Sequence, residues 1–128
     1  MFSRTLMMAS SLFMAIAGFI ASFFPQELLH YLELTTPRLA IVIIQILGAL
    51  YLGFALLNWM AKGVLIGGIY GKPLLMGNLL HFMMVALALI KTSVNHPSLE
   101  IILGLIMYSI FAAGFGYLLF NTPKAVSE

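Results

Sequence analysis

The chain has 128 residues, of which 62% are hydrophobic and only 8% are charged, and its formal net charge is +2. Soluble domains carry about 25% charged residues, so this composition excludes a water-soluble globule. A bilayer core about 30 Å thick needs about 20 apolar residues per helix, which leaves room for four or five spans and no separate soluble domain. The absence of cysteine excludes disulfides and thiolate chemistry, and so small a net charge does not indicate a nucleic-acid surface.

The first predicted span covers residues 5–24, and no charged residue interrupts it. A signal peptide has an apolar region of about 7–15 residues, so the length of this run favours a mature membrane span. Small side chains recur along one narrow stripe of the predicted helix, and such side chains let two helix backbones approach closely. The stripe consists of Ser11, Ala15, Gly18 and Ser22.

Residues 25–38 form the first connection, and Pro25 suits the first turn of a helix. Leucines on one side and charged residues on the other predict a short helix in the membrane interface, ended before Pro37. Glu27 and His30 have a spacing that two metal ligands can use. An exposed interfacial histidine is more often simply solvated, so we favour that interpretation.

The second predicted span covers residues 39–61 and contains two amides, Gln45 and Asn58. An amide that faces lipid has no hydrogen-bond partner, so we expect its face to point into a helix bundle. That face consists of Gln45, Gly48, Leu52, Ala55 and Trp59. Trp59 is also one turn from the end of the span, at the depth where tryptophan anchors membrane helices.

Residues 62–72 connect the second span to the third and include four glycines. Glycine disfavours helix, and the segment is too short to cross the membrane and return, so we expect a loop at the head groups with Tyr70 as its anchor. A phosphate-binding loop is excluded. Ile66 stands where that motif requires glycine, and Pro73 stands where it requires serine or threonine.

The third predicted span covers residues 73–90 and the fourth covers residues 101–120, with a polar connection at 91–100 that breaks at Pro97. One face of the third span consists of Gly77, Asn78, His81, Met84, Val85, Ala88 and Thr92. The fourth span contains a patch of small residues, which indicates helix packing. This patch consists of Ser109, Ala112, Ala113 and Gly116.

Four spans divide the basic residues unequally between the two sides of the membrane. The side that holds both termini carries Arg4, Lys62, Lys72 and Lys124. The other side carries only Arg38 and Lys91. The positive-inside rule therefore predicts that both termini are cytoplasmic.

Polar residues within the spans define a candidate site. The depth of each residue in the membrane follows from its distance to the end of its helix, at about 1.5 Å per residue. Residues of neighbouring antiparallel helices that lie at the same depth predict a polar layer near the membrane centre. The layer consists of Ser11, Tyr51, His81 and Tyr108, and Gly53 leaves room for His81. Asn58 and Asn78 form a second predicted pair nearer the cytoplasm.

An ionisable residue inside a membrane span is costly to bury, so its presence suggests a functional role. The candidate ligand-binding residues are therefore Tyr51, His81, Tyr108, Asn58 and Asn78. The layer could bind a lipid or quinone head group or another small molecule, or relay a proton. The alternative is structural: a neutral His81 bonded to a tyrosine, with both asparagines joining helices.

Enzymatic chemistry is not expected. The chain has no aspartate and no cysteine, and no acidic residue lies inside a predicted span, so paired-carboxylate and Ser-His-Asp mechanisms are excluded there. We expect no cofactor and no metal site. The nine methionines, including Met83 and Met84, are expected to fill gaps in packing rather than bind copper.

The stretch LGALYLGFALLNWMAKG, followed by GNLLHF, resembles small four-span bacterial membrane proteins of a loosely DoxX-like type. The resemblance depends on Gly48, Gly53, Asn58, Trp59 and Asn78. It implies a four-span architecture in a bacterial inner membrane. The DoxX name is tied to a respiratory, quinone-linked complex, which implies an accessory-subunit role, although no residue set here matches a quinone site.

We therefore expect an all-α integral membrane protein, with residues 1–128 forming a single domain. Its predicted architecture is an up-down-up-down four-helix bundle with a short interfacial helix after the first span. The favoured function is that of a non-enzymatic accessory subunit, or a binder of a lipid or apolar molecule inside the central hairpin. The alternative is a small homo-oligomeric transporter or channel with His81 in its pathway. Expected partners are membrane lipids and further copies or a larger membrane complex, but no nucleic acid.

Overall fold

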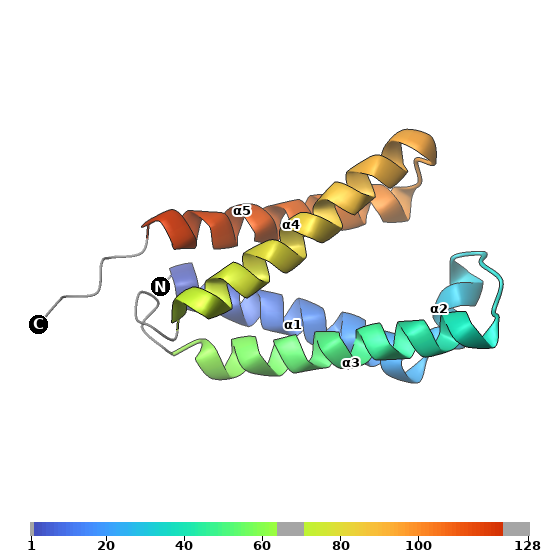
Figure 1. Ribbon diagram of the computed structural model, residues 1–128, viewed down its shortest axis with the longest axis horizontal. Helices are drawn as coiled ribbons and strands as arrows, with labels where there is room; N and C mark the ends of the chain where they lie inside the picture. Colours follow the sequence, from blue (N-terminus) through green and yellow to red (C-terminus); the bar gives the residue numbers. More distant parts are fainter. Residues whose placement is uncertain (1, 64–70, 122–128) are drawn as a thin grey trace, which may run out of the picture. The chain divides into compact units, whose positions relative to one another are not determined.

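The structure is a computed structural model that describes residues 2–63 and 71–121, and these residues are all-helical. The helices, in chain order, are α1 (Phe2–Phe23), α2 (Pro25–Tyr31), α3 (Arg38–Ala61), α4 (Gly71–Asn95) and α5 (Leu99–Asn121) (Figure 1). The fold class predicted above, with four long helices and a short helix after the first, is confirmed. Residues 64–70 of the predicted head-group loop, including Tyr70, lie outside the described residues, and its last two residues, Gly71 and Lys72, belong to α4.

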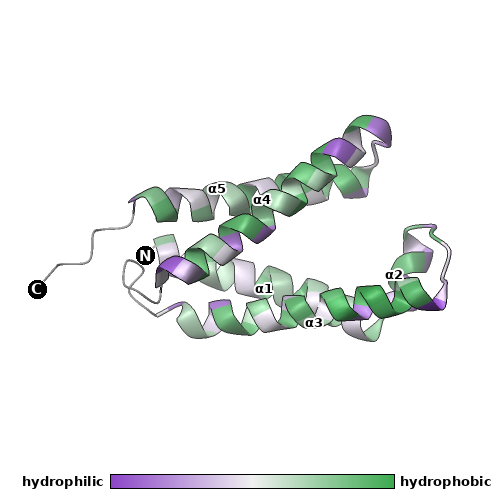
Figure 2. Cartoon of the chain, in the orientation of Figure 1, coloured by the Kyte–Doolittle hydropathy of each residue, from purple (hydrophilic) through white to green (hydrophobic). Residues whose placement is uncertain are grey.

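The four long helices, α1, α3, α4 and α5, are each long and apolar enough to cross a membrane. Figure 2 shows apolar residues along most of their length, with hydrophilic residues concentrated toward helix ends. A helix with apolar residues on all sides is stable in lipid because its backbone groups are satisfied within the helix. The protein is therefore a multi-pass membrane protein.

The chain divides into two compact units, residues 1–63 and residues 64–128. In the first unit, α1 and α3 pack side by side as an antiparallel pair, and α2 lies in the connection between them (Figure 1). In the second unit, α4 packs against α5. The single-domain prediction stays a prediction.

Helix α2 ends in a Schellman motif. The backbone N–H of Leu34 donates to the carbonyl of Leu29, and that of Glu33 donates to the carbonyl of His30. Glu33 adopts a φ of 57°, in the left-handed region that usually requires glycine. The buried Leu29 fixes the apolar side of α2 while His30 remains exposed.

The α1–α3 contact brings two backbones together at Gly18 and Gly48. A Cβ atom added to Gly18 would lie 2.9 Å from the carbonyl oxygen of Gly48, and one added to Gly48 would lie 2.7 Å from the backbone nitrogen of Ser22. Only glycine fits at such an approach. The small-residue packing stripe predicted on the first span is therefore confirmed at Gly18 and Ser22.

The face predicted on the second span is buried at Gly48 and Ala55, and Asn58 extends it. Gln45 and Trp59 are exposed, and the prediction that they point into a four-helix bundle stays a prediction. Gln45 lies near the end of α1, where its Nε2 is 3.5 Å from the Ser22 carbonyl oxygen. Trp59 is rotated by about 100° from Asn58 around the helix.

The α4–α5 contact is aromatic. Phe82 has no exposed surface, and its ring centroid lies 4.9 Å from that of Phe111, 5.5 Å from Tyr108 and 5.7 Å from Phe115. The rings of Phe82 and Phe115 are nearly parallel, at 8°. Such ring pairs stabilise a contact beyond the apolar area that they bury.

The small-residue patch predicted on the fourth span faces α4 only in part: Ser109 and Ala113 are exposed, whereas a Cβ atom added to Gly116 would lie 3.6 Å from Leu79 Cδ1. The rings of Tyr108, Phe111 and Phe115 occupy the contact. On α4, Asn78 of the face described above is buried, whereas Met84, Ala88 and Thr92 are exposed. The buried residues of α4 recur every three or four positions at Gly71, Leu75, Asn78, Phe82 and Ala86.

Helix α4 continues to Asn95, beyond the predicted end of the third span at residue 90. Thr92 donates its hydroxyl to the carbonyl of Ala88, and Asn95 donates its amide to that of Lys91. These local bonds satisfy polar side chains within the helix, so a polar sequence does not end it. Pro97 follows, and the Ser98 hydroxyl accepts the Ile101 N–H at the start of α5.

Candidate functional site

Polar side chains of the first unit meet between α1 and α3. Asn58 has no exposed surface, and its Nδ2 donates to the Ser10 hydroxyl over 3.0 Å. Ser10 in turn donates to the Met7 carbonyl over 3.1 Å, and Ser11 donates to the Ala55 carbonyl over 2.6 Å. The Asn58–Ser10 and Ser11–Ala55 bonds join the two helices, so the cluster contributes to packing in a medium that offers no water.

Local sequence explains this cluster. Ser10 and Ser11 are adjacent on α1, while Ala55 and Asn58 are three residues apart on α3 and therefore share a face. The small side chain at Ala55 leaves its carbonyl accessible to Ser11. Tyr51, another predicted site residue, is half-buried two turns before Asn58.

Three of the five predicted site residues belong to the second unit. His81 is half-buried, and its ring centroid lies 6.0 Å from that of Tyr108 and 5.1 Å from that of Phe82. Asn78 has no exposed surface, and its Nδ2 donates to the Leu74 carbonyl over 2.9 Å. The structure thus brings His81 and Tyr108 close together, as the depth argument predicts.

Other predicted pairings link residues of different units. They are Tyr51 with His81, Gly53 with His81, and Asn58 with Asn78. Each stays a prediction, as does a ligand-binding role for any of the five residues. What the structure adds is a hydrogen bond from Asn58 to α1, a hydrogen bond of Asn78 within α4 and an aromatic environment for His81.

The second unit also contains an apolar groove between α4 and α5, with a volume of about 320 Å³. We name it the α4–α5 groove. It is lined by Met76, Gly77, Leu79, Leu80, Met83 and Leu119. Figure 1 shows α4 and α5 diverging toward the first turn of α4. Ligand pockets have volumes of about 300–1,000 Å³, so the groove is large enough for a slender apolar group.

The groove is open on one side, because Met76 is 53% exposed, Leu80 58% and Met83 41%. None of the five predicted site residues lines it. His81 follows Leu80 directly, yet successive residues of a helix are rotated by about 100°. His81 therefore does not line the groove, although Gly77, one turn before it, does.

Sequence reasoning missed the groove, although one signal was present. Met76, Leu80 and Met83 are spaced by four and three residues, which places them on one side of a helix. Methionine is flexible and polarizable, and it adapts to ligands of variable shape.

No group of three or more potential metal ligands occurs within residues 2–63 and 71–121. Glu27 and His30, the pair weighed above as metal ligands, are both exposed on α2. Comparisons with protein-family models, with curated proteins and with solved structures give no match to the chain.

Proposed function

We propose that the protein is a small, non-enzymatic membrane protein that binds the acyl chain of a lipid in the α4–α5 groove. The observation that carries this proposal is the groove itself, whose six lining residues offer only apolar side chains and a glycine. They lie on helices long and apolar enough to cross a membrane. An acyl chain is the apolar group that surrounds such helices.

The extent of the groove along α4 is compatible with an acyl chain. Met76 and Met83 are seven residues apart on α4, which corresponds to about 10 Å along the helix axis. A volume of about 320 Å³ along this stretch of α4 accommodates a segment of acyl chain. Each methylene group that is buried in the groove contributes up to about 0.8 kcal/mol to the binding free energy. For a lipid that already lies in the bilayer, this gain comes from closer packing.

A variant that fills the groove tests the proposal. Leu80→Trp places a larger side chain at the opening, and Leu87→Trp is the matched control, because Leu87 is exposed to a similar extent outside the groove. We expect Leu80→Trp to lower the retention of phosphatidylcholine by about tenfold, which corresponds to losing fewer than two methylene contacts. Native mass spectrometry of the detergent-solubilised protein measures the bound lipid. Equal retention by both variants would contradict the proposal.

We also propose that the protein resides in a bacterial inner membrane with both termini in the cytoplasm. The distribution of basic residues supports this orientation, and the DoxX-like resemblance supports the location. An accessory-subunit role and the alternative transporter function stay predictions.

Single cysteines test the orientation without background, because the chain has no native cysteine. Gly63→Cys is a suitable site, since a Cβ atom there would meet no other atom within 4 Å. His96→Cys, in the exposed connection between α4 and α5, reports on the other side. We expect an impermeant maleimide to label His96→Cys in intact cells, and Gly63→Cys only after the inner membrane is permeabilised. The opposite pattern would overturn the orientation.

A further inference from the structure

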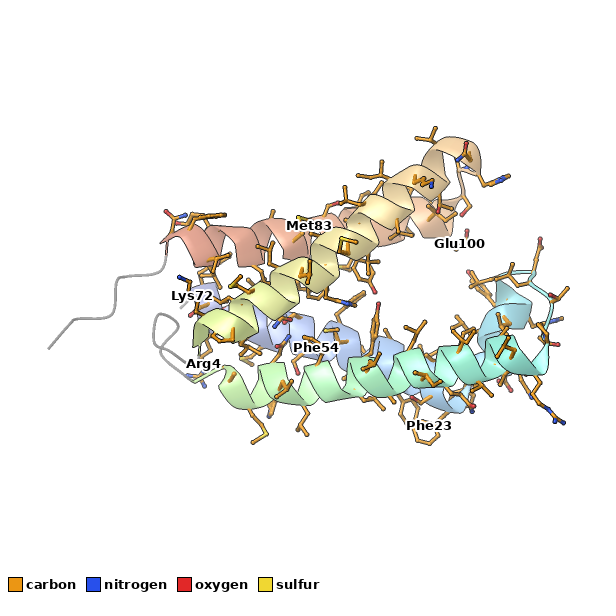
Figure 3. All side chains as sticks on the ribbon, viewed as in Figure 1. Arg4, Phe23, Phe54, Lys72, Met83 and Glu100 are labelled. Carbon is orange, nitrogen blue, oxygen red and sulfur yellow. The ribbon has the colours of Figure 1, made fainter. Side chains whose placement is uncertain are left out.

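We infer that the ligand of the α4–α5 groove is an anionic phospholipid of the leaflet next to Lys72, with Lys72 binding its phosphate head group. This inference rests on the proposed function, because it names the lipid class for the same groove. It starts from the position of Lys72, which is exposed in the first turn of α4. Met83 lies near the middle of the same helix (Figure 3).

Lys72 lies on the same side of α4 as the groove. Met76, Leu80 and Met83 follow it at four, eight and eleven residues, and these intervals return to one side of an α-helix. The lysine ammonium group is thus located at the membrane-boundary end of the apolar slot. A lysine stem packs along apolar surface while its charge remains at the interface.

The distance along α4 matches one leaflet. Eleven residues separate Lys72 from Met83, which is about 16 Å of helix axis. Half of a hydrocarbon core about 30 Å thick is about 15 Å. A phospholipid whose phosphate contacts Lys72 would therefore extend its acyl chain through the groove to about the membrane centre. A free apolar molecule would need no charged group at this end.

The charge of the second unit favours an anionic head group at this end. Glu100 is the only acidic residue between 71 and 121, and it lies at the far end of α4 and α5, away from Lys72 (Figure 3). A lysine near an anionic bilayer surface contributes about 1 kcal/mol, which corresponds to about a fivefold preference. In the proposed orientation this end of α4 faces the cytoplasmic leaflet.

A lipid competition experiment tests the inference. The full-length protein in detergent is mixed with equal amounts of phosphatidylglycerol and phosphatidylcholine of identical acyl chains but distinguishable isotopic mass, and bound lipid is counted by native mass spectrometry. We expect about a fivefold preference for phosphatidylglycerol. Lys72→Gln should remove the preference and retain lipid binding. Lys91→Gln, at the other end of α4, should keep the preference.

The outcomes separate this inference from the proposed function. Equal binding of the two lipids by the unaltered protein, or an unchanged preference in Lys72→Gln, would overturn the head-group assignment and leave the groove as an acyl site. Unchanged lipid retention in Leu80→Trp would overturn the groove itself. A lipid-free dimer that dissociates in Leu80→Trp would assign the groove to a second copy of the chain, which also overturns the inference.

Discussion

Asn58 has no exposed surface, and its hydrogen bond to Ser10 crosses between α1 and α3. In a membrane the alternative to this bond is an amide among acyl chains, where no water replaces the partner. Measured bonds of this kind nevertheless contribute only about 0.6 kcal/mol on average, because the unfolded helices also find partners. Asn58 thus contributes to the specificity of packing more than to its strength.

A double-mutant cycle with Asn58→Leu and Ser10→Ala tests this bond. We expect a coupling free energy of about 0.6 kcal/mol and at most about 1.7 kcal/mol, measured from unfolding in mixed detergent. Each single variant should lose the bond, and the double variant should lose little more. Strict additivity of the two changes would show that the bond does not contribute to stability.

His81 lies beside the rings of Phe82 and Tyr108 and does not line the groove, so its replacement tests a different site. We expect His81→Leu to leave phosphatidylcholine retention within about twofold of the unaltered protein, since leucine conserves most of the apolar contact. Native mass spectrometry under the conditions used for Leu80→Trp provides the comparison. A tenfold loss in His81→Leu would return the ligand site to the polar layer predicted from the sequence.

The two helix pairs achieve close packing by opposite means. Between α1 and α3, Gly18 and Gly48 remove side chains so that backbones touch. Between α4 and α5, Phe82 inserts a ring among three rings of the other helix. A contact that depends on large rings at one point leaves the helices apart elsewhere, and the groove occupies such a place.

Gly48→Ala tests the backbone contact. We expect a loss of about 1–3 kcal/mol in the unfolding free energy, because a single methyl group must move α1 away from α3. Gly53→Ala is the control on the same helix, since its Cβ would meet no atom within 4 Å. It should be neutral or stabilising by up to about 1 kcal/mol through helix propensity. Equal losses in both variants would contradict the close contact at Gly48.

At the scale of the whole molecule, the sequence predicts the membrane helices well for a simple reason. Uncharged runs of about 20 residues have few stable alternatives to a spanning helix. The end of α4 is different. Thr92 and Asn95 make hydrogen bonds to their own helix, and this local compensation is not visible in a hydropathy pattern.

The helix faces are harder to predict in such a chain. Because nearly all residues of α5 are apolar, hydrophobic periodicity does not distinguish the side that faces α4 from the side that faces lipid. Small residues identify the packed face of α1 at Gly18, but on α5 the exposed Ala113 does not distinguish the side that faces α4. The groove exists because α4 and α5 are not in close contact along their whole length. The sequence indicates it only through the spacing of Met76, Leu80 and Met83.

The most direct test of the acyl-chain site is photolabelling in a bilayer. The protein is reconstituted into vesicles that contain a phospholipid with a diazirine at mid-chain, and the labelled peptides are mapped by mass spectrometry. The account predicts concentrated labelling of residues 76–83, which falls when Leu80 is replaced by tryptophan. Labelling spread evenly over every exposed apolar face, including residues 12–20 of α1, would contradict it.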